Sequence, residues 1–162
     1  MKTFAPANIL LPKNVAFEKW AVIACDQFTS QPEYWQRVRE NVGEEVSTLN
    51  LVFPEAELNV DRVERIKNIN ENMVKYLAAD LFAEYQDAYI YVERTLKNGV
   101  VRKGLVGVID LEQYDYNADS KSAIRATEQT VLERIPPRVE IRRNASMELP
   151  HVLLLCDDEK ER

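Results

Sequence analysis

Apolar residues recur along the chain with two spacings, one typical of helices and one typical of strands. The clearest helical spacing lies between Asn59 and Phe82, where apolar side chains fall every three or four residues and form one stripe. The stripe consists of Val60, Val63, Ile66, Ile69, Met73, Tyr76, Leu77 and Leu81. The intervening positions carry charges of both signs, as a solvated face does. This segment is predicted to form one long helix.

A second, shorter helix is predicted in the segment "TSQPEYWQRVRENVG". Ser30, followed by Glu33 three residues later, matches a capping box, in which each side chain satisfies a free backbone N–H at the start of a helix. Pro32 is acceptable within the first turn, where its missing N–H costs no hydrogen bond. Gly43 supplies the stop, because glycine readily adopts the left-handed conformation that ends many helices.

The strongest turn signal is Asn98-Gly99, which lies between two β-rich runs in "AYIYVERTLKNGVVRKGLVGVIDL". A hairpin is predicted there. Gly104 and Gly107 fall in its second strand, where glycine marks a bulge or a close approach of another backbone. Apolar runs elsewhere predict further strands at residues 7–11, 20–25, 48–54 and 151–156, those at 20–25 and 151–156 being buried.

This order of elements is α+β, or mixed α/β, rather than an alternating β-α-β array. We expect several short strands including the Asn98-Gly99 hairpin, one long helix, and two or three shorter helices. A chain of 162 residues is long enough for one core and short for two, so residues 1–162 are expected to form a single domain. Because "DDEKER" follows the last predicted strand at once, we expect the N-terminal portion of a longer protein.

Composition excludes several classes of function. The net charge of −6 does not favour nucleic-acid binding, which normally needs a basic excess. The four glycines form no phosphate-binding loop of the Walker or Rossmann type. The single histidine, His151, rules out histidine-rich metal sites, and Cys25 and Cys156 form no C-x-x-C zinc motif.

The same features bear on location. Two cysteines far apart in the sequence fit a reducing compartment with free thiols. No apolar run of about 18 residues is present, so no transmembrane helix is expected. The first residues, "MKTFAPANILLPKN", make a poor signal peptide. A cytoplasmic protein without a membrane partner is therefore expected.

The candidate chemistry lies in "IRATEQTVLERIPPRVEIRRNA", residues 124–145, where five arginines against three glutamates leave a local charge of +2. A helix over Ile124–Leu132 would place Arg125 and Glu128 on one face, where they pair. Pro136-Pro137 must interrupt that helix, and Pro137 suits the first position of a second one, "PRVEIRRNA". Guanidinium groups near a helix N-terminus favour anions.

The candidate ligand-binding residues are Arg125, Glu128, Arg134, Arg138, Arg142 and Asp26. Asp26 follows the strand predicted at 20–25, where its carboxylate either reaches a site or caps the next turn. Cys25 is a poor nucleophile, because a neighbouring carboxylate raises the pKa of a thiol. The same arginines and glutamates also fit an ordinary surface network of ion pairs, and the sequence leaves both readings open. It indicates no catalytic residue, cofactor or metal site.

Several stretches resemble one known family. They are "EKWAVIACDQFTSQPEYW", "STLNLVFPE", "YVERTL", "RKGLVGVIDLEQYDY", "IRATEQTVLERIPPRVEIRRNA" and "ELPHVLLL". In this order, over nearly the whole chain, they resemble a bacterial family of uncharacterised proteins, catalogued as a domain of unknown function. Some of its members are labelled as chromosome-partition (ParB-like) proteins, but this chain lacks the G-[EH]-x-R motif of partition proteins. The resemblance implies a longer protein and carries no activity, cofactor or catalytic residue.

Two functions follow as hypotheses. In the first, the arginine segment binds a small anion or a nucleotide, and Glu128 or Asp26 holds a metal or acts as a base, as in a phosphotransfer enzyme. In the second, the chain is a regulatory or scaffold module that binds nucleic-acid phosphates or a protein partner. Nucleic acid is the less favoured ligand, and a homodimer remains open. The sequence does not decide whether the protein is an enzyme.

Overall fold

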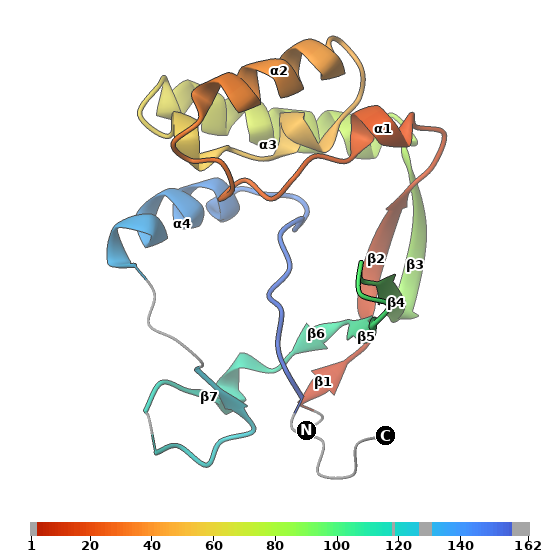
Figure 1. Ribbon diagram of the computed structural model, residues 1–162, viewed down its shortest axis with the longest axis vertical. Helices are drawn as coiled ribbons and strands as arrows, with labels where there is room; N and C mark the ends of the chain where they lie inside the picture. The colour runs from red at the N-terminus through yellow and green to blue at the C-terminus, as the bar shows by residue number, and fades with distance from the viewer. Residues whose placement is uncertain (1–2, 118, 127–130, 157–162) are drawn as a thin grey trace. The chain divides into compact units, whose positions relative to one another are not determined.

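The computed structural model describes residues 3–117, 119–126 and 131–156. In chain order its strands are β1 (Phe4–Ala5), β2 (Ala7–Pro12), β3 (Phe82–Ala88), β4 (Ile90–Thr95), β5 (Val101–Val106), β6 (Val108–Ile109), β7 (Tyr114–Asp115) and β8 (Ile124–Arg125). Its α-helices are α1 (Phe17–Trp20), α2 (Pro32–Val42), α3 (Arg62–Ala78) and α4 (Ile135–Arg143), and its 3-10 turns are η1 (Thr48–Leu51), η2 (Glu55–Glu57), η3 (Leu111–Gln113) and η4 (Leu132–Arg134). The fold is α+β, as predicted (Figure 1).

The contacts divide the chain into two compact units. The strand unit comprises Met1–Lys13 and Asp80–Leu132, and the helical unit comprises Asn14–Ala79 and Glu133–Arg162. Each unit is therefore built from two separate stretches of the chain. The expectation of a single domain stays a prediction.

The strand unit is built from pairs of strands. Three pairs are antiparallel, β1 with β6, β2 with β3, and β4 with β5, whereas β7 and β8 are parallel. The pairing of β2, from Ala7 to Pro12, confirms the first predicted strand. The expected close approach occurs at Gly107, where an added Cβ would lie 2.6 Å from the carbonyl oxygen of Ala5. Gly104 has open space around it instead.

The predicted hairpin is formed by β4 and β5. The carbonyl oxygen of Leu96 accepts a hydrogen bond from the N–H of Gly99 at 2.9 Å and closes the turn. Gly99 adopts φ = +83°, a left-handed conformation that costs a residue with a Cβ about 1–2 kcal/mol. The N–H of Val100 also donates to Asn98 Oδ1 at 3.2 Å. Asn98 and Gly99 thus both serve the turn, as their sequence predicted.

The core of the helical unit gathers around Trp35, which is completely buried, and around Leu51 and Phe53. Helix α3 contributes Ile69, Met73 and Tyr76 to this core. Val60 and Val63, which belong to the apolar stripe predicted for this helix, are exposed. The long helix is confirmed, but its buried residues begin only at Ile69.

Tyr76 also anchors η1 through polar contacts. Its hydroxyl oxygen accepts hydrogen bonds from the N–H of Ser47 at 3.1 Å and from Nδ2 of Asn50 at 2.9 Å. The hydroxyl of Thr48 donates to the carbonyl oxygen of Trp20 at 2.7 Å. These contacts join η1 to both α1 and α3 and satisfy polar groups that lie in or beside the core.

Three predicted strands are wrong. Residues 20–25 contain the end of α1 and an extended segment that forms no ladder, because the hydroxyl of Thr48 is the partner of Val22 N–H, at 3.4 Å. Residues 48–54 begin as η1, because Ser47 Oγ accepts a hydrogen bond from the N–H of Leu49 at 3.2 Å and caps the turn. Residues 151–156 are irregular and exposed, since no strand of the described part of the chain pairs with them.

Three predictions about helix starts are also wrong in part. Helix α2 is present and ends at Gly43, but its N-cap is Gln31 without a side-chain hydrogen bond, so Ser30 and Glu33 form no capping box. Ile124 and Arg125 form strand β8 rather than the start of a helix. Residues 127–130 lie outside the described residues. A helix is present after residue 134, but α4 begins at Ile135, so Pro137 is its third residue rather than its first.

Candidate functional site

The 3-10 turn η2 carries two glutamates, and each meets two arginines. Glu57 meets Arg39 and Arg65, and Glu55 meets Arg134 and Arg138. We call these six residues the arginine cluster. The arginines come from α2, from α3, and from α4 and the residue before it, so η2 connects three helices. Both carboxylate side chains are about nine-tenths buried, whereas the arginine side chains are between 31% and 49% exposed.

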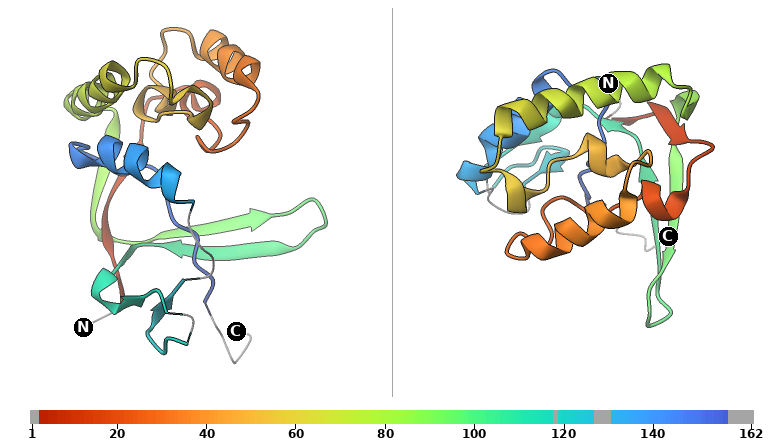
Figure 2. Two further views of the ribbon diagram at one scale, coloured as in Figure 1. Left: turned by 90° about the vertical axis from the view of Figure 1, so that its left-hand side faces the viewer. Right: turned by 90° about the horizontal axis from the view of Figure 1, so that it is seen from above.

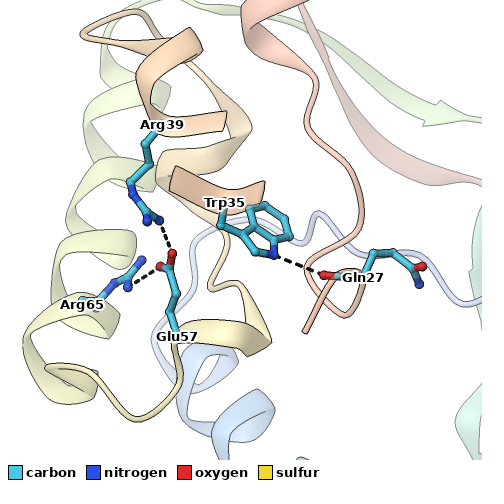
Figure 3. Close-up of polar contacts among 5 residues, drawn as sticks. All are labelled: Gln27, Trp35, Arg39, Glu57 and Arg65. Carbon is cyan, nitrogen blue, oxygen red and sulfur yellow. Dashed lines mark hydrogen bonds and ion pairs between the residues drawn. The ribbon is translucent and has the colours of Figure 1, made fainter. Parts of the chain in front are cut away.

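Glu57 lies between α2 and α3 (Figure 3). Its Oε1 accepts a hydrogen bond from Nη1 of Arg39, and its Oε2 lies 2.5 Å from Nη1 of Arg65. Burial raises the pKa of Glu57, but the contacts of Arg39 and Arg65 outweigh burial and leave the pKa below its ordinary value. The guanidinium of Arg65 also lies 4.7 Å from the ring centroid of Phe53, a cation–π contact with the core.

Trp35 holds the loop that precedes α2. Its indole N–H donates to the carbonyl oxygen of Gln27 at 3.2 Å, and Figure 3 shows this bond beside the Glu57 ion pairs. The N–H of Glu55 donates to the carbonyl oxygen of Cys25 at 2.8 Å. The loop that carries Asp26 is therefore fixed both to α2 and to η2.

Glu55 supplies negative charge at the start of α4. Its Oε1 lies 2.6 Å from Nη2 of Arg138, and its Oε2 lies 3.7 Å from Nε of Arg134. Arg134 is the N-cap of α4, and the first turn of this helix has no acidic residue of its own. A carboxylate is favourable at this place because the dipole of the helix is positive at its N-terminus, although Pro136 and Pro137 have no N–H to donate there.

Arg138 is the central cation of this end of the cluster. The hydrogen bond to Glu55 raises the pKa of Arg138, although partial burial opposes it, and the charge of Asp26 adds to the increase. The guanidinium therefore stays charged at every physiological pH. Burial, Asp26 and Glu55 also raise the pKa of the Cys25 thiol, which keeps this group neutral where the guanidinium is kept charged. A thiol held in its neutral form is a poor nucleophile, as the sequence indicated.

The structure brings together two of the six residues that the sequence selected. Arg134 and Arg138 meet at Glu55, whereas Arg142 pairs with Glu148 at 2.9 Å. Asp26 is exposed, and its Oδ1 accepts a hydrogen bond from Nε2 of Gln27 at 3.2 Å.

The other two selected residues lie elsewhere in the sequence, and the structure does not test them as members of this group. Arg125 lies in β8 of the strand unit, and Glu128 lies outside the described residues. That any of the six binds a ligand stays a prediction.

Four members of the arginine cluster were missed in the sequence: Arg39, Glu55, Glu57 and Arg65. The stretch "PEAEL" that carries both glutamates follows the strand predicted at 48–54 and has no periodicity of its own. Glu55 and Arg138 are 83 positions apart, so no local pattern could pair them. A further ion pair, 2.6 Å between Arg62 of α3 and Glu140 of α4, adds to the contacts of these two helices.

Within the described residues, no three or more His, Cys, Asp or Glu side chains group in a way that could hold a metal ion. Both cysteines, Cys25 and Cys156, are free. In the same part of the chain, no helix has the length and apolar character needed to cross a bilayer.

Comparison with known proteins gives one match. Residues 5–162 match the family model described as "Protein of unknown function (DUF1015)". Neither the curated proteins nor the solved structures contain a match to the chain. The family description names no reaction, ligand or partner and makes no reference to chromosome partition. Because the match covers nearly the whole sequence, the chain belongs to the DUF1015 family of proteins of unknown function.

Proposed function

We propose that the helical unit binds a small anionic ligand, a carboxylate or a phosphorylated compound such as a nucleotide, at Arg134 and Arg138. The observation that supports this proposal is the sharing of one carboxylate, Glu55, by two guanidinium groups. Two positive charges against one negative charge leave an excess that a second anion would neutralise. Asp26 is near enough to add to the pKa of Arg138 but does not pair with it.

The unused donors of the two arginines support the same proposal. Each guanidinium has five N–H groups in a planar fork that matches carboxylates and phosphates. Glu55 takes a hydrogen bond from Nη2 of Arg138, and Nε of Arg134 approaches it only at ion-pair distance. Both side chains are nearly half exposed, at 44% and 49%. Glu55 thus orients both forks while most of their donors remain accessible to a ligand.

We propose the cytoplasm as the location, where two free thiols are chemically stable. The proposal includes no reaction, because the geometry around Arg138 contains neither an activated nucleophile nor a metal site among the described side chains. A regulatory or scaffold role remains the alternative.

The test is thermal unfolding of the chain with inorganic phosphate, acetate and ATP as separate probes. A ligand at about 100 times its Kd should stabilise the native state by about 2.7 kcal/mol. Arg138→Ala should abolish that stabilisation. The matched control is Arg62→Ala, because Arg62 lies in the same unit and also has Nη2 2.6 Å from a glutamate oxygen. Equal responses from both variants and the wild type, or no response to any probe, would reject this site.

A further inference from the structure

The hairpin of β4 and β5 places two arginines directly opposite each other. Arg94 pairs with Arg102 in the antiparallel register, and both are exposed. Like charges at directly opposed positions destabilise a pair of strands. Among the described residues, the side chain of neither arginine has a hydrogen bond or an ion pair. The hairpin therefore carries an uncompensated repulsion that the fold itself does not relieve.

The two faces of the hairpin differ in charge. Residues directly opposite each other share a face, so one face carries Val92, Arg94, Arg102 and Gly104. We call it the arginine face. On the other face Glu93 opposes Lys103, and the hydroxyl of Tyr91 donates to Glu93 at 2.8 Å. Positive charge is compensated on that second face and accumulates on the arginine face.

The charge of the hairpin also contrasts with that of the chain. Between residues 90 and 106, four basic residues against one acidic residue give a charge of +3, while the whole chain carries −6. The four basic residues are Arg94, Lys97, Arg102 and Lys103. All four are exposed. The expectation against nucleic acid rested on the net charge of the whole chain, and that number does not show that the β4–β5 hairpin is basic.

Gly104 opens the arginine face to a close approach. It lies opposite Val92 and next to the arginine pair in the register. A Cβ added at Gly104 would have no atom within 4 Å, so this part of the ribbon presents bare backbone. Figure 2 shows the two strands running together away from the β2–β3 pair, with β4 and β5 forming a sheet of their own. Because both arginines are exposed and Gly104 has no side chain, an extended polymer can approach this face closely.

We propose that the arginine face of the β4–β5 hairpin binds the phosphate backbone of duplex nucleic acid. The major groove of B-DNA is about 12 Å wide and admits a two-stranded β-ribbon. Phosphates between Arg94 and Arg102 remove the repulsion that the register creates. An open surface holds a single small anion poorly, whereas a polyanion gains affinity through release of its condensed counterions. This site is separate from the one proposed at Arg134 and Arg138 and does not depend on it.

The experiment is fluorescence anisotropy of a fluorescein-labelled duplex DNA of mixed sequence, titrated with the chain at several salt concentrations. For two phosphate contacts, a plot of log affinity against log salt should have a slope of about −2. The affinity should then fall about tenfold between about 50 and 200 mM salt. Absence of binding at the lowest salt concentration would overturn the proposal.

Two neighbouring variants test the face. Arg102→Ala and Lys103→Ala each remove one positive charge from adjacent positions on opposite faces of β5. We expect Arg102→Ala to reduce the salt slope by about one and to weaken binding several-fold, and Lys103→Ala to leave the slope unchanged. Equal losses in both variants would mean that charge alone attracts DNA and would overturn the assignment to the arginine face.

Three controls complete the design. Amide proton spectra of both variants should retain the signals of β4 and β5, since the substituted side chains are exposed. Vesicles of phosphatidylserine and phosphatidylcholine serve as a second polyanionic surface, and binding to vesicles without binding to DNA would reject nucleic acid as the ligand. Arg138→Ala should bind DNA as the wild type does, which separates this result from the test of the small-anion site.

Discussion

Glu57 is the residue whose charge should matter most to the stability of the helical unit. Glu57→Gln keeps the shape of the side chain and removes its charge, leaving Arg39 and Arg65 without their carboxylate. Removing one partner of a fully buried ion pair costs about 3–5 kcal/mol, and a hydrogen bond to a charged group contributes about 1.5–3 kcal/mol. Because the arginine side chains are 46% and 31% exposed and can be hydrated, we expect a loss of about 2 kcal/mol.

Tryptophan fluorescence during urea unfolding measures this loss in the correct unit. The chain has two tryptophans, and both Trp20 and Trp35 lie in the helical unit. With an m-value of about 1–2 kcal/mol/M, a loss of about 2 kcal/mol lowers the urea midpoint by about 1–2 M. The matched control is Glu140→Gln, because Glu140 pairs with Arg62 but is 47% exposed. That variant should lose less than about 1 kcal/mol.

The pH dependence gives the sharper test. The pKa of Glu57 is lower in the folded state than in the unfolded chain. Its contribution to the free energy of unfolding is therefore complete above the unfolded pKa of about 4.3 and is lost as the pH falls through the folded pKa. Protonated Glu57 is neutral, as glutamine is, so wild type and variant should converge in acid. A difference that stays constant from neutral pH to about pH 3, or none at neutral pH, would refute this account of η2.

Three further predictions concern other parts of the molecule. Tyr76→Phe removes the hydroxyl that accepts the hydrogen bond from the N–H of buried Ser47. The free energy of unfolding should fall by about 1–3 kcal/mol in the same fluorescence assay. No loss would mean that water reaches this N–H. Gly99→Ala forces a residue with a Cβ into a left-handed conformation, which should destabilise the hairpin by about 1 kcal/mol or more. The amide of Leu96 donates to the carbonyl oxygen of Val100 beside this turn. Its hydrogen exchange with solvent should therefore be at least about fivefold faster in the variant. Leu153 is 85% exposed beside other exposed apolar residues, an arrangement that favours self-association. Sedimentation velocity should show self-association that increases with protein concentration and is weaker in Leu153→Lys. A monomer at every concentration would exclude the homodimer.

Elements with strong local signals were predictable from the sequence. Helix α2 has proline in its first turn and glycine at its end, and the hairpin turn uses Gly99 with positive φ. Proline has the backbone angle that the first turn of a helix needs, and glycine adopts a positive φ at little cost. Both signals lie within a few positions of the feature that they predict. The prediction therefore needed no knowledge of distant contacts.

Short apolar runs were not predictable in the same way. Leu51 and Phe53 are both buried, as the alternation in residues 48–54 required, but Ser47 caps a 3-10 turn at the start of that run. Alternating burial fixes which side chains face the core and does not show whether a partner strand is present. Residues 151–156 illustrate the same limit, because their apolar character predicted a buried strand and the structure leaves Leu155 exposed.

The same contrast between local signals and distant contacts applies to the arginine cluster. The four-residue spacing of Arg134 and Arg138 was visible in the sequence, but their shared partner, Glu55, was not. Likewise, only the register of β4 and β5 shows that Arg94 and Arg102 oppose each other directly. Spacing along a helix is a local property, whereas the partner of a charge depends on how distant segments pack.

The number of arginines in a stretch is therefore a weaker indicator of ligand binding than the balance of each arginine with its partners. Arg39 and Arg65 share the carboxylate of Glu57, which is 10% exposed. These two ion pairs stabilise the fold, so both arginines are accounted for without a ligand. Arg134 and Arg138 share one carboxylate but keep half-exposed forks, so part of their hydrogen-bonding capacity is unused. Arg94 and Arg102 face each other, and the described structure gives them no anion at all. The repulsion between Arg94 and Arg102 lowers the stability of the hairpin, and binding of an external anion would offset this loss of stability.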